Sequence, residues 1–291
     1  MSVSSFSDKS LLIDVEELSN CLDNVTLLDL RPTDDYALGH LPGARHIDIY
    51  GISLNDTSDA PLEAFLSIFN VLFGSRGVQA EKSVVVYDHE SGERAARAVW
   101  LLSVLGHPNV RLLDGGSSAW RRSGRSFVSV RFADAPITPD KAPPFVGEKR
   151  LELLATRFDV HEAIERDDVI IVDVRRESEN RGIEKRAQRA GAIPGSVHIF
   201  WRDHLDADGK LRPADEIRSL YEANGVTPDK SIIAFCQGGY RSANTFITLK
   251  SLGFKNVRNY VGSWGEWGNR DDSLIISPQW SLVWTINFTI W

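Results

Sequence analysis

Residues 84–120 read VVVYDHESGERAARAVWLLSVLGHPNVRLLDGGSSAW, and residues 232–267 read IIAFCQGGYRSANTFITLKSLGFKNVRNYVGSWGEW. Both stretches start with an apolar run, pass through a polar loop that contains glycine, and continue into a long helical pattern. Near their ends, Gly115 and Trp120 match Gly262 and Trp267 at one constant offset. Because this period is far longer than that of a solenoid, the chain contains a duplicated domain.

The duplication extends toward the start of each repeat. Residues 27–47 (LLDLRPTDDYALGHLPGARHI) resemble residues 171–199 (IVDVRRESENRGIEKRAQRAGAIPGSVHI). In each, an apolar run ends in Asp-x-Arg and a Pro-Gly turn follows. The two pairs are Asp29 with Arg31 and Asp173 with Arg175. Their presence in both copies predicts that they fix loops by local ion pairing.

Each repeat alternates apolar runs with helical patterns. The runs VTLLDL, SVVVYD, DVIIVDV and SIIAFC are apolar throughout, which is typical of strands buried on both faces of a parallel sheet. The patterns RAARAVWLLSVLG and SANTFITLKSLG end in Gly106 and Gly253, which we expect to stop two helices. We therefore predict an α/β fold in which each domain is a mostly parallel sheet flanked by helices. The predicted segments are a first domain (1–133), a linker (134–148), a second domain (149–275) and an apolar C-terminal tail (276–291) of undetermined role.

Charge and composition restrict the function. Lys and Arg total 33 against 40 Asp and Glu, and the net charge of -7 argues against a nucleic-acid partner. The two cysteines are too few for a disulfide scaffold or a thiolate metal cluster. We find neither a secretory signal nor an apolar stretch long enough to span a membrane. We expect a cytoplasmic protein without a cofactor, a bound metal or a membrane partner.

One loop of the second repeat is expected to carry the chemistry. Cys236 follows an apolar run directly and precedes a helical pattern that starts at Ser242. Backbone N–H groups of such a loop converge on the sulfur, and Arg241 adds a positive charge, so we expect the pKa of Cys236 to lie below its usual value. Cys21, in VEELSNCLDNV, has no such surroundings and is predicted to be structural. The candidate active-site loop is Cys236, Gln237, Gly238, Gly239, Tyr240 and Arg241.

The length of this loop separates two enzyme classes. Protein tyrosine phosphatases also place a cysteine and an arginine around a loop before a helix, but with one more residue between them. Here four residues separate Cys236 from Arg241. The tighter loop suits a single sulfur atom bound to cysteine better than a phosphoryl group, so the spacing favours sulfur chemistry.

The chain resembles the tandem-domain rhodanese family of thiosulfate and 3-mercaptopyruvate sulfurtransferases. Besides the Asp-x-Arg pairs, the motifs that carry the resemblance are GHLPGA (39–44), GAIPGS (191–196), CQGGYR (236–241) and YVGSWGEWGNR (260–270). The resemblance implies that Cys236 takes sulfane sulfur from a small donor, forms a persulfide and passes the sulfur to a thiophilic acceptor. Such an acceptor is cyanide, a small thiol or a thioredoxin-type protein.

The resemblance also separates the roles of the two repeats. Asp88 stands in place of the cysteine in the first repeat, with Arg94 following it. Because a carboxylate cannot accept sulfane sulfur, the first domain is expected to be catalytically silent. The family arrangement then places the active site in the cleft between the domains.

Several further residues have a predicted place. Arg181 matches the family's donor-contacting arginine by position, and Lys185, Arg186 and Arg189 make its loop basic, either as an anion funnel or as a solvated loop. Trp120 and Trp267 are expected to pack, whereas Trp264 either lines the cleft or packs.

The donor is the least constrained part of the sequence prediction. Arg241 supplies the only positive charge of the loop, and no Ser or Thr lies within it to serve a mercaptopyruvate-type relay. We therefore favour thiosulfate as the donor. A 3-mercaptopyruvate sulfurtransferase is the alternative, and a phosphatase or a non-catalytic sulfur-relay module is less favoured. The physiological donor and acceptor and the oligomeric state are not determined by the sequence.

Overall fold

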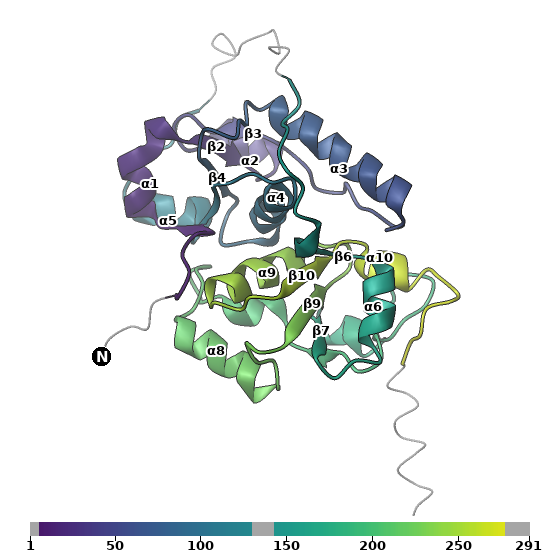
Figure 1. Cartoon of the computed structure of the whole chain (residues 1–291). Helices are drawn as coiled ribbons and strands as arrows, with labels where there is room; N and C mark the ends of the chain where they lie inside the picture. The colour runs from purple at the N-terminus through teal and green to yellow at the C-terminus, as the bar shows by residue number, and fades with distance from the viewer. Residues whose placement is uncertain (1–5, 130–142, 277–291) are drawn as a thin grey trace, which may run out of the picture.

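The computed structural model describes residues 6–129 and 143–276. Most of the predicted linker, and the predicted tail from residue 277 onward, lie outside the described residues. Within the described ranges the two repeats form two separate domains of the same architecture, stacked on one another (Figure 1).

Each domain is built on a five-stranded sheet in which all strand pairs are parallel. The strand orders are β1-β5-β4-β2-β3 and β6-β10-β9-β7-β8, so the duplication is reproduced strand by strand. The strands of the first sheet are β1 (Leu12–Ile13), β2 (Thr26–Asp29), β3 (Arg45–His46), β4 (Val84–Tyr87) and β5 (Val110–Leu113). Those of the second are β6 (Leu154–Ala155), β7 (Val169–Asp173), β8 (Val197–His198), β9 (Ser231–Phe235) and β10 (Val257–Tyr260).

The helices follow the strands in the same order in both domains. The first domain contains α1 (Val15–Cys21), α2 (Thr33–Leu38), α3 (Asp59–Gly74), α4 (Glu93–Val104) and α5 (Gly116–Arg122). The second contains α6 (Arg157–Ala163), α7 (Glu177–Asn180), α8 (Ala214–Ala223), α9 (Arg241–Ser251) and α10 (Ser263–Trp267). Gly106 and Gly253, just after α4 and α9, both have φ of 87°, the left-handed conformation that the sequence predicts for helix stops.

The sheets are buried on both faces, as their apolar runs predict. In β4, Val84 and Val86 belong to one hydrophobic cluster, and Val85 and Tyr87 belong to another on the opposite face. The first of these clusters also contains Ile232 of β9 and therefore extends through both domains. The parallel α/β fold inferred from the repeats is confirmed.

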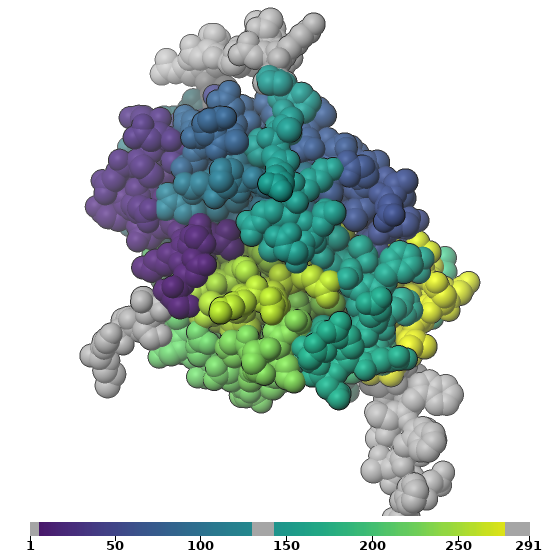
Figure 2. Space-filling view, viewed as in Figure 1, coloured from purple at the N-terminus to yellow at the C-terminus, as the bar shows by residue number. Residues whose placement is uncertain are grey.

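The two domains share an extensive interface. Helix α4 packs directly against α9, and these helices follow the loops that begin with Asp88, after β4, and with Cys236, after β9 (Figure 1). The space-filling view shows the domains in close contact, with the segment after residue 142 running over the first domain (Figure 2). In that segment the N–H of Phe145 donates to the carbonyl of Asn70 at 2.8 Å. The carboxyl edges of β4 and β9 are therefore held at a fixed interface.

The duplicated ion pairs fix loops, as predicted. Arg31 and Asp29 pair at 2.6 Å, and so do Arg175 and Asp173, with all four side chains almost fully buried. Arg175 also donates to the carbonyl of Gly191 at 2.8 Å and so joins the strand end to a distant loop. Trp120, Trp264 and Trp267 are all buried. In the parts of the chain that the structure describes, none of the helices has the length and apolarity needed to span a bilayer.

Candidate active site

Cys236 lies directly after β9, at the carboxyl edge of the second sheet. Its N–H donates to Oγ of Ser263 at 3.1 Å, and its carbonyl accepts from the N–H of Trp264 at 3.0 Å. Ser263 has φ of 51°, the only left-handed residue other than glycine among the described residues. Backbone strain of this kind persists only where the surroundings enforce it. The strained turn at Ser263 therefore helps to set the position of Cys236, which sequence analysis did not foresee.

The surroundings of the sulfur favour the thiolate. Burial alone would raise the pKa of Cys236, but the charge of Arg241 and hydrogen bonds from Ser242 and the Gly238 N–H lower it below its ordinary value. The Ser242 hydroxyl donates to Sγ at 3.4 Å. This direction agrees with the expectation from the sequence. The helix α9 starts at Arg241, one residue earlier than predicted.

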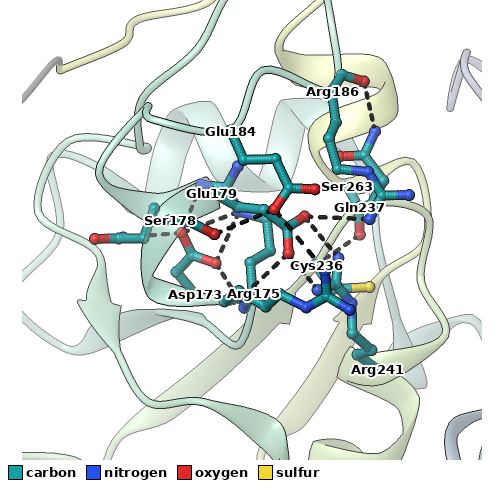
Figure 3. A network of polar contacts seen from close by, with 12 residues as sticks. Asp173, Arg175, Ser178, Glu179, Glu184, Arg186, Cys236, Gln237, Arg241 and Ser263 are labelled. Carbon is teal, nitrogen blue, oxygen red and sulfur yellow. Dashed lines mark hydrogen bonds and ion pairs between the residues drawn. The ribbon is translucent and has the colours of Figure 1, made fainter.

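Arg241 is held by a buried carboxylate that the sequence analysis missed. Its two terminal nitrogens contact the two oxygens of Glu179 at 2.5 and 2.9 Å, and Glu179 is only 1% exposed (Figure 3). Burial would raise the pKa of Glu179, but the bonds and charge of Arg241, with Arg186 at 3.5 Å, bring it down to about 2. Glu179 therefore orients the guanidinium and neutralises much of its charge.

A cavity of about 630 Å³ opens between the two domains, with Cys236 in its wall. The first domain contributes residues such as Tyr50 and Asn55, and the second contributes the loop residues Gln237, Gly238, Tyr240 and Arg241. Cys236 itself is 1% exposed, so a substrate reaches the sulfur only by entering this cavity. Figure 3 shows the sulfur at the edge of the polar network, on the side away from Asp173.

The cavity rim is basic, but not through the residue that we expected. Arg181 is 57% exposed, pairs with Glu177 on its own helical turn, and does not line the cavity. The donor contact predicted for Arg181 is therefore not supported. Arg186, five residues later, does line the cavity, together with Arg176 and Arg202.

The other two basic residues of this loop, Arg189 and Lys185, do not form the anion funnel that the sequence offered as one interpretation. Arg189 donates to the carbonyls of Ser273 and Trp267 and so fixes the backbone. Lys185 is exposed and does not line the cavity. Trp264 is buried against Arg175, with the guanidinium carbon 4.2 Å from its ring centre, and it belongs to the core rather than to the cavity.

The comparisons with known proteins agree with this geometry. A family model described as Rhodanese-like domain matches the chain twice, at residues 14–123 and 156–270. The chain belongs to the rhodanese family. It is 35% identical over 273 residues to a thiosulfate sulfurtransferase of Pseudomonas aeruginosa, covering 93% of this chain and 98% of that protein. It is 32% identical to the sulfur carrier protein TtuD of Thermus thermophilus, covering 91% and 95% of the two chains.

A solved structure shares the fold of this rhodanese. The anaerobic ergothioneine biosynthesis enzyme from Chlorobium limicola superposes with a TM-score of 0.79 at 21% identity, covering 94% of this chain and 71% of that one. At this identity the likeness concerns the fold alone. The resemblance noted in the sequence, with its two rhodanese domains, is thus confirmed.

The first rhodanese repeat keeps the loop but not the nucleophile. Tyr87 pairs with Asp29 across the sheet as Phe235 pairs with Asp173, so Asp88 and Cys236 follow equivalent positions. Asp88 accepts the N–H groups of Gly92 and Ala95 at 3.1 and 3.0 Å, and burial raises its pKa to about 6. A carboxyl group thus occupies the place where the second repeat holds the cysteine.

The start of the following helix also differs between the repeats. Glu93 opens α4, whereas Arg241 opens α9. Arg94, which the sequence placed after Asp88 as the counterpart of the loop arginine, instead lies over the ring of Tyr50 at 3.9 Å. The first repeat therefore lacks the cysteine, and its arginine, Arg94, is the second residue of α4 and lies against Tyr50.

Proposed function

We propose that this rhodanese is a thiosulfate sulfurtransferase that works through a persulfide on Cys236. The thiolate attacks the outer sulfur of thiosulfate, a bond forms between the two sulfur atoms, and the sulfur–sulfur bond of thiosulfate breaks with its electron pair leaving on sulfite. An acceptor nucleophile then attacks the terminal sulfur of the persulfide and regenerates the thiolate. The observation that carries this proposal is the thiolate-favouring Cys236 in the wall of a basic cavity between the domains.

We assign the residues around Cys236 as follows. The N–H groups of the loop from Gln237 to Tyr240 and the Ser242 hydroxyl stabilise the anionic sulfur. Arg241 contributes its charge from a position set by Glu179. Arg186 takes the donor-binding role that the sequence gave to Arg181, because its side chain reaches the cavity. A dianion such as thiosulfate gains more from such a rim than a neutral donor does.

The two repeats have different parts in this proposal. The first domain, residues 1–133, is silent and forms one wall of the cavity, and the second, residues 149–275, carries the reaction. The acceptor is cyanide, a small thiol or the exposed thiol of a thioredoxin-type protein. We retain the cytoplasmic location as a prediction from the sequence, which fractionation of cells that express the protein tests.

Steady-state kinetics test the proposal. A covalent persulfide predicts ping-pong behaviour, that is, parallel double-reciprocal lines when thiosulfate is varied at several fixed acceptor concentrations. We expect a higher kcat/KM with thiosulfate than with 3-mercaptopyruvate under the same conditions. Intersecting lines contradict the persulfide cycle, and a higher kcat/KM with 3-mercaptopyruvate replaces the donor that we propose.

A sulfur carrier is the second candidate function, because one relative bears that name at 32% identity. A carrier accepts sulfur on Cys236 only from a partner protein and does not turn over small molecules. Release of thiocyanate from thiosulfate and cyanide by the purified chain alone favours the enzyme. Its absence, combined with persulfide formation in the presence of a sulfur-donating protein, favours the carrier.

A further inference from the structure

A buried arginine of the silent domain contacts the active-site loop. Arg97 lies on α4 and is 0% exposed. Its guanidinium donates to the carbonyl of Gly238, within the loop, and to the carbonyl of Ile52 at 2.7 Å. It therefore joins the loop of one domain to a loop of the other.

The charge of Arg97 is not neutralised by a carboxylate. In the described ranges 6–129 and 143–276, none of the Asp and Glu side chains forms an ion pair with it, and its Nε has no hydrogen-bond partner. The guanidinium carbon instead lies 3.8 Å from the ring centre of Tyr240, a loop residue. Burial lowers the pKa of Arg97 to about 10, which leaves the group charged at neutral pH, while the charge of Cys236 raises it.

This environment contrasts with that of Arg241. Arg241 is closer to the sulfur in sequence, but both of its terminal nitrogens contact the Glu179 carboxylate. A neutralised pair contributes little net potential at a neighbouring site, whereas an unpaired buried cation acts through a medium of low polarity. Arg97 therefore presents an unneutralised positive charge to the loop from the first domain, in addition to the paired charge of Arg241.

The duplication provides an internal comparison. Asn244 of α9 is the counterpart of Arg97 in the second repeat, because the two residues have the same separation in sequence as the matched glycines Gly115 and Gly262. Asn244 donates to the carbonyl of Ser91 at 2.7 Å, and Ser91 stands at that same offset from Gly238. Each helix thus donates to the loop of the other domain. Only the hydrogen-bond donor that contacts the cysteine-containing loop, Arg97, is charged; the donor that contacts the loop of the first domain, Asn244, is neutral.

We propose that Arg97 is a positioning residue for the persulfide loop, which it serves from the silent domain. It fixes the peptide between Gly238 and Gly239, and it supplies an unneutralised positive charge that stabilises the Cys236 thiolate. Because a trans peptide points its C=O and N–H in opposite directions, holding the Gly238 carbonyl also fixes the direction of the Gly239 N–H. The inference deepens the proposed function, since the anion that it stabilises is the nucleophile of that reaction.

The variant Arg97→Gln tests the electrostatic part. We expect the thiol pKa, measured from the pH dependence of iodoacetamide alkylation of Cys236, to rise by about one pH unit. At pH values below that pKa, the alkylation rate then falls about tenfold. A purely structural Arg97 predicts a lower melting temperature with an unchanged thiol pKa. That result, in a folded variant, overturns the proposal.

Two further variants complete the experiment. Arg97→Lys keeps the charge but loses the planar fork, so we expect a nearly unchanged thiol pKa and a kcat/KM for thiosulfate about tenfold lower. Asn244→Ala removes the reciprocal contact and serves as the control, with an unchanged thiol pKa. If Arg97→Gln does not fold, the proposal is tested with Arg97→Lys alone. An unaltered kcat/KM for thiosulfate in that variant refutes the proposal.

Two separate measurements distinguish a failure of this inference from a failure of the proposed function: the thiol pKa from alkylation, and the uptake of sulfur from thiosulfate. A wild-type protein that takes up no sulfur from thiosulfate refutes the proposed function, whatever Arg97 does. If the pKa of the Cys236 thiol is unchanged when the charge at position 97 is removed, the inference is refuted, whatever the sulfur donor is.

Discussion

Replacing Glu179 by Gln removes the carboxylate that pairs with Arg241. Glu179 is 1% exposed, and its pKa lies at about 2 instead of the ordinary 4.5. At about 1.4 kcal/mol per pH unit, this difference corresponds to about 3 kcal/mol of folding free energy at neutral pH. Because Arg241 and Arg186 border an open cavity, solvent screening reduces the figure to about 2–3 kcal/mol. The variant also leaves the Arg241 guanidinium buried without its partner.

The pH dependence has a definite sign. A carboxyl whose pKa is depressed in the folded state stabilises the protein above its ordinary pKa, and this contribution is lost as the pH falls through the folded value. For Glu179 the loss occurs as the pH falls from about 5 to about 2. We expect Glu179→Gln to melt on the order of 5–10 °C below the wild type at neutral pH, and the gap to narrow toward pH 3.

Differential scanning calorimetry over this pH range measures both effects. The matched control is Glu177→Gln, which removes an exposed carboxylate from the same short helix and is expected to cost less than about 1 kcal/mol. In Glu179→Gln the charge of Arg241 is no longer neutralised, so we also expect Cys236 to be alkylated faster at acidic pH. A melting temperature equal to that of the control, or a gap independent of pH, refutes the reasoning.

Three other outcomes follow from the site. Ser263→Gly relieves the left-handed strain while Ser263→Ala keeps it, and both lose the bond to Cys236, so thermal unfolding should show the Ala variant to be less stable by about 1 kcal/mol; equal stabilities contradict this. Asp88→Cys combined with Cys236→Ser should show no sulfur transfer in the thiocyanate assay, because an acidic residue opens the following helix; measurable transfer contradicts the silence of the first repeat. Arg186→Gln should raise KM for thiosulfate about tenfold with a nearly unchanged kcat, whereas Arg181→Gln, its control, should leave initial rates unaltered; equal effects contradict the assignment of donor binding.

The features predicted correctly from the sequence are local or duplicated. The continuous apolar runs specify buried parallel strands, and the order of strand, cysteine, glycines and arginine places the loop at the carboxyl edge of the sheet. The pair of Asp173 and Arg175 is separated by a single residue and recurs in the first repeat. Such patterns can be recognised in the sequence without knowledge of the tertiary structure.

The missed residues reach the site from other elements. Glu179 gave no distinct signal, since Asp35 stands at the same distance after its own strand in the first repeat and is only partly buried there. Arg97 looks like one polar position in an apolar helix, and only the packing of α4 on α9 brings it to the loop. The choice between Arg181 and Arg186 depends on the path of an irregular segment, which periodicity does not encode.

The most direct test of the account is the mass of the protein after incubation with thiosulfate alone. A persulfide on Cys236 predicts an increase of about 32 Da, located by peptide mapping to the segment with Cys236 and removed by cyanide. Cys21→Ser should retain the adduct and Cys236→Ser should lose it. An unchanged mass, or an adduct on Cys21, contradicts the assignment of Cys236 as the sulfur-carrying nucleophile.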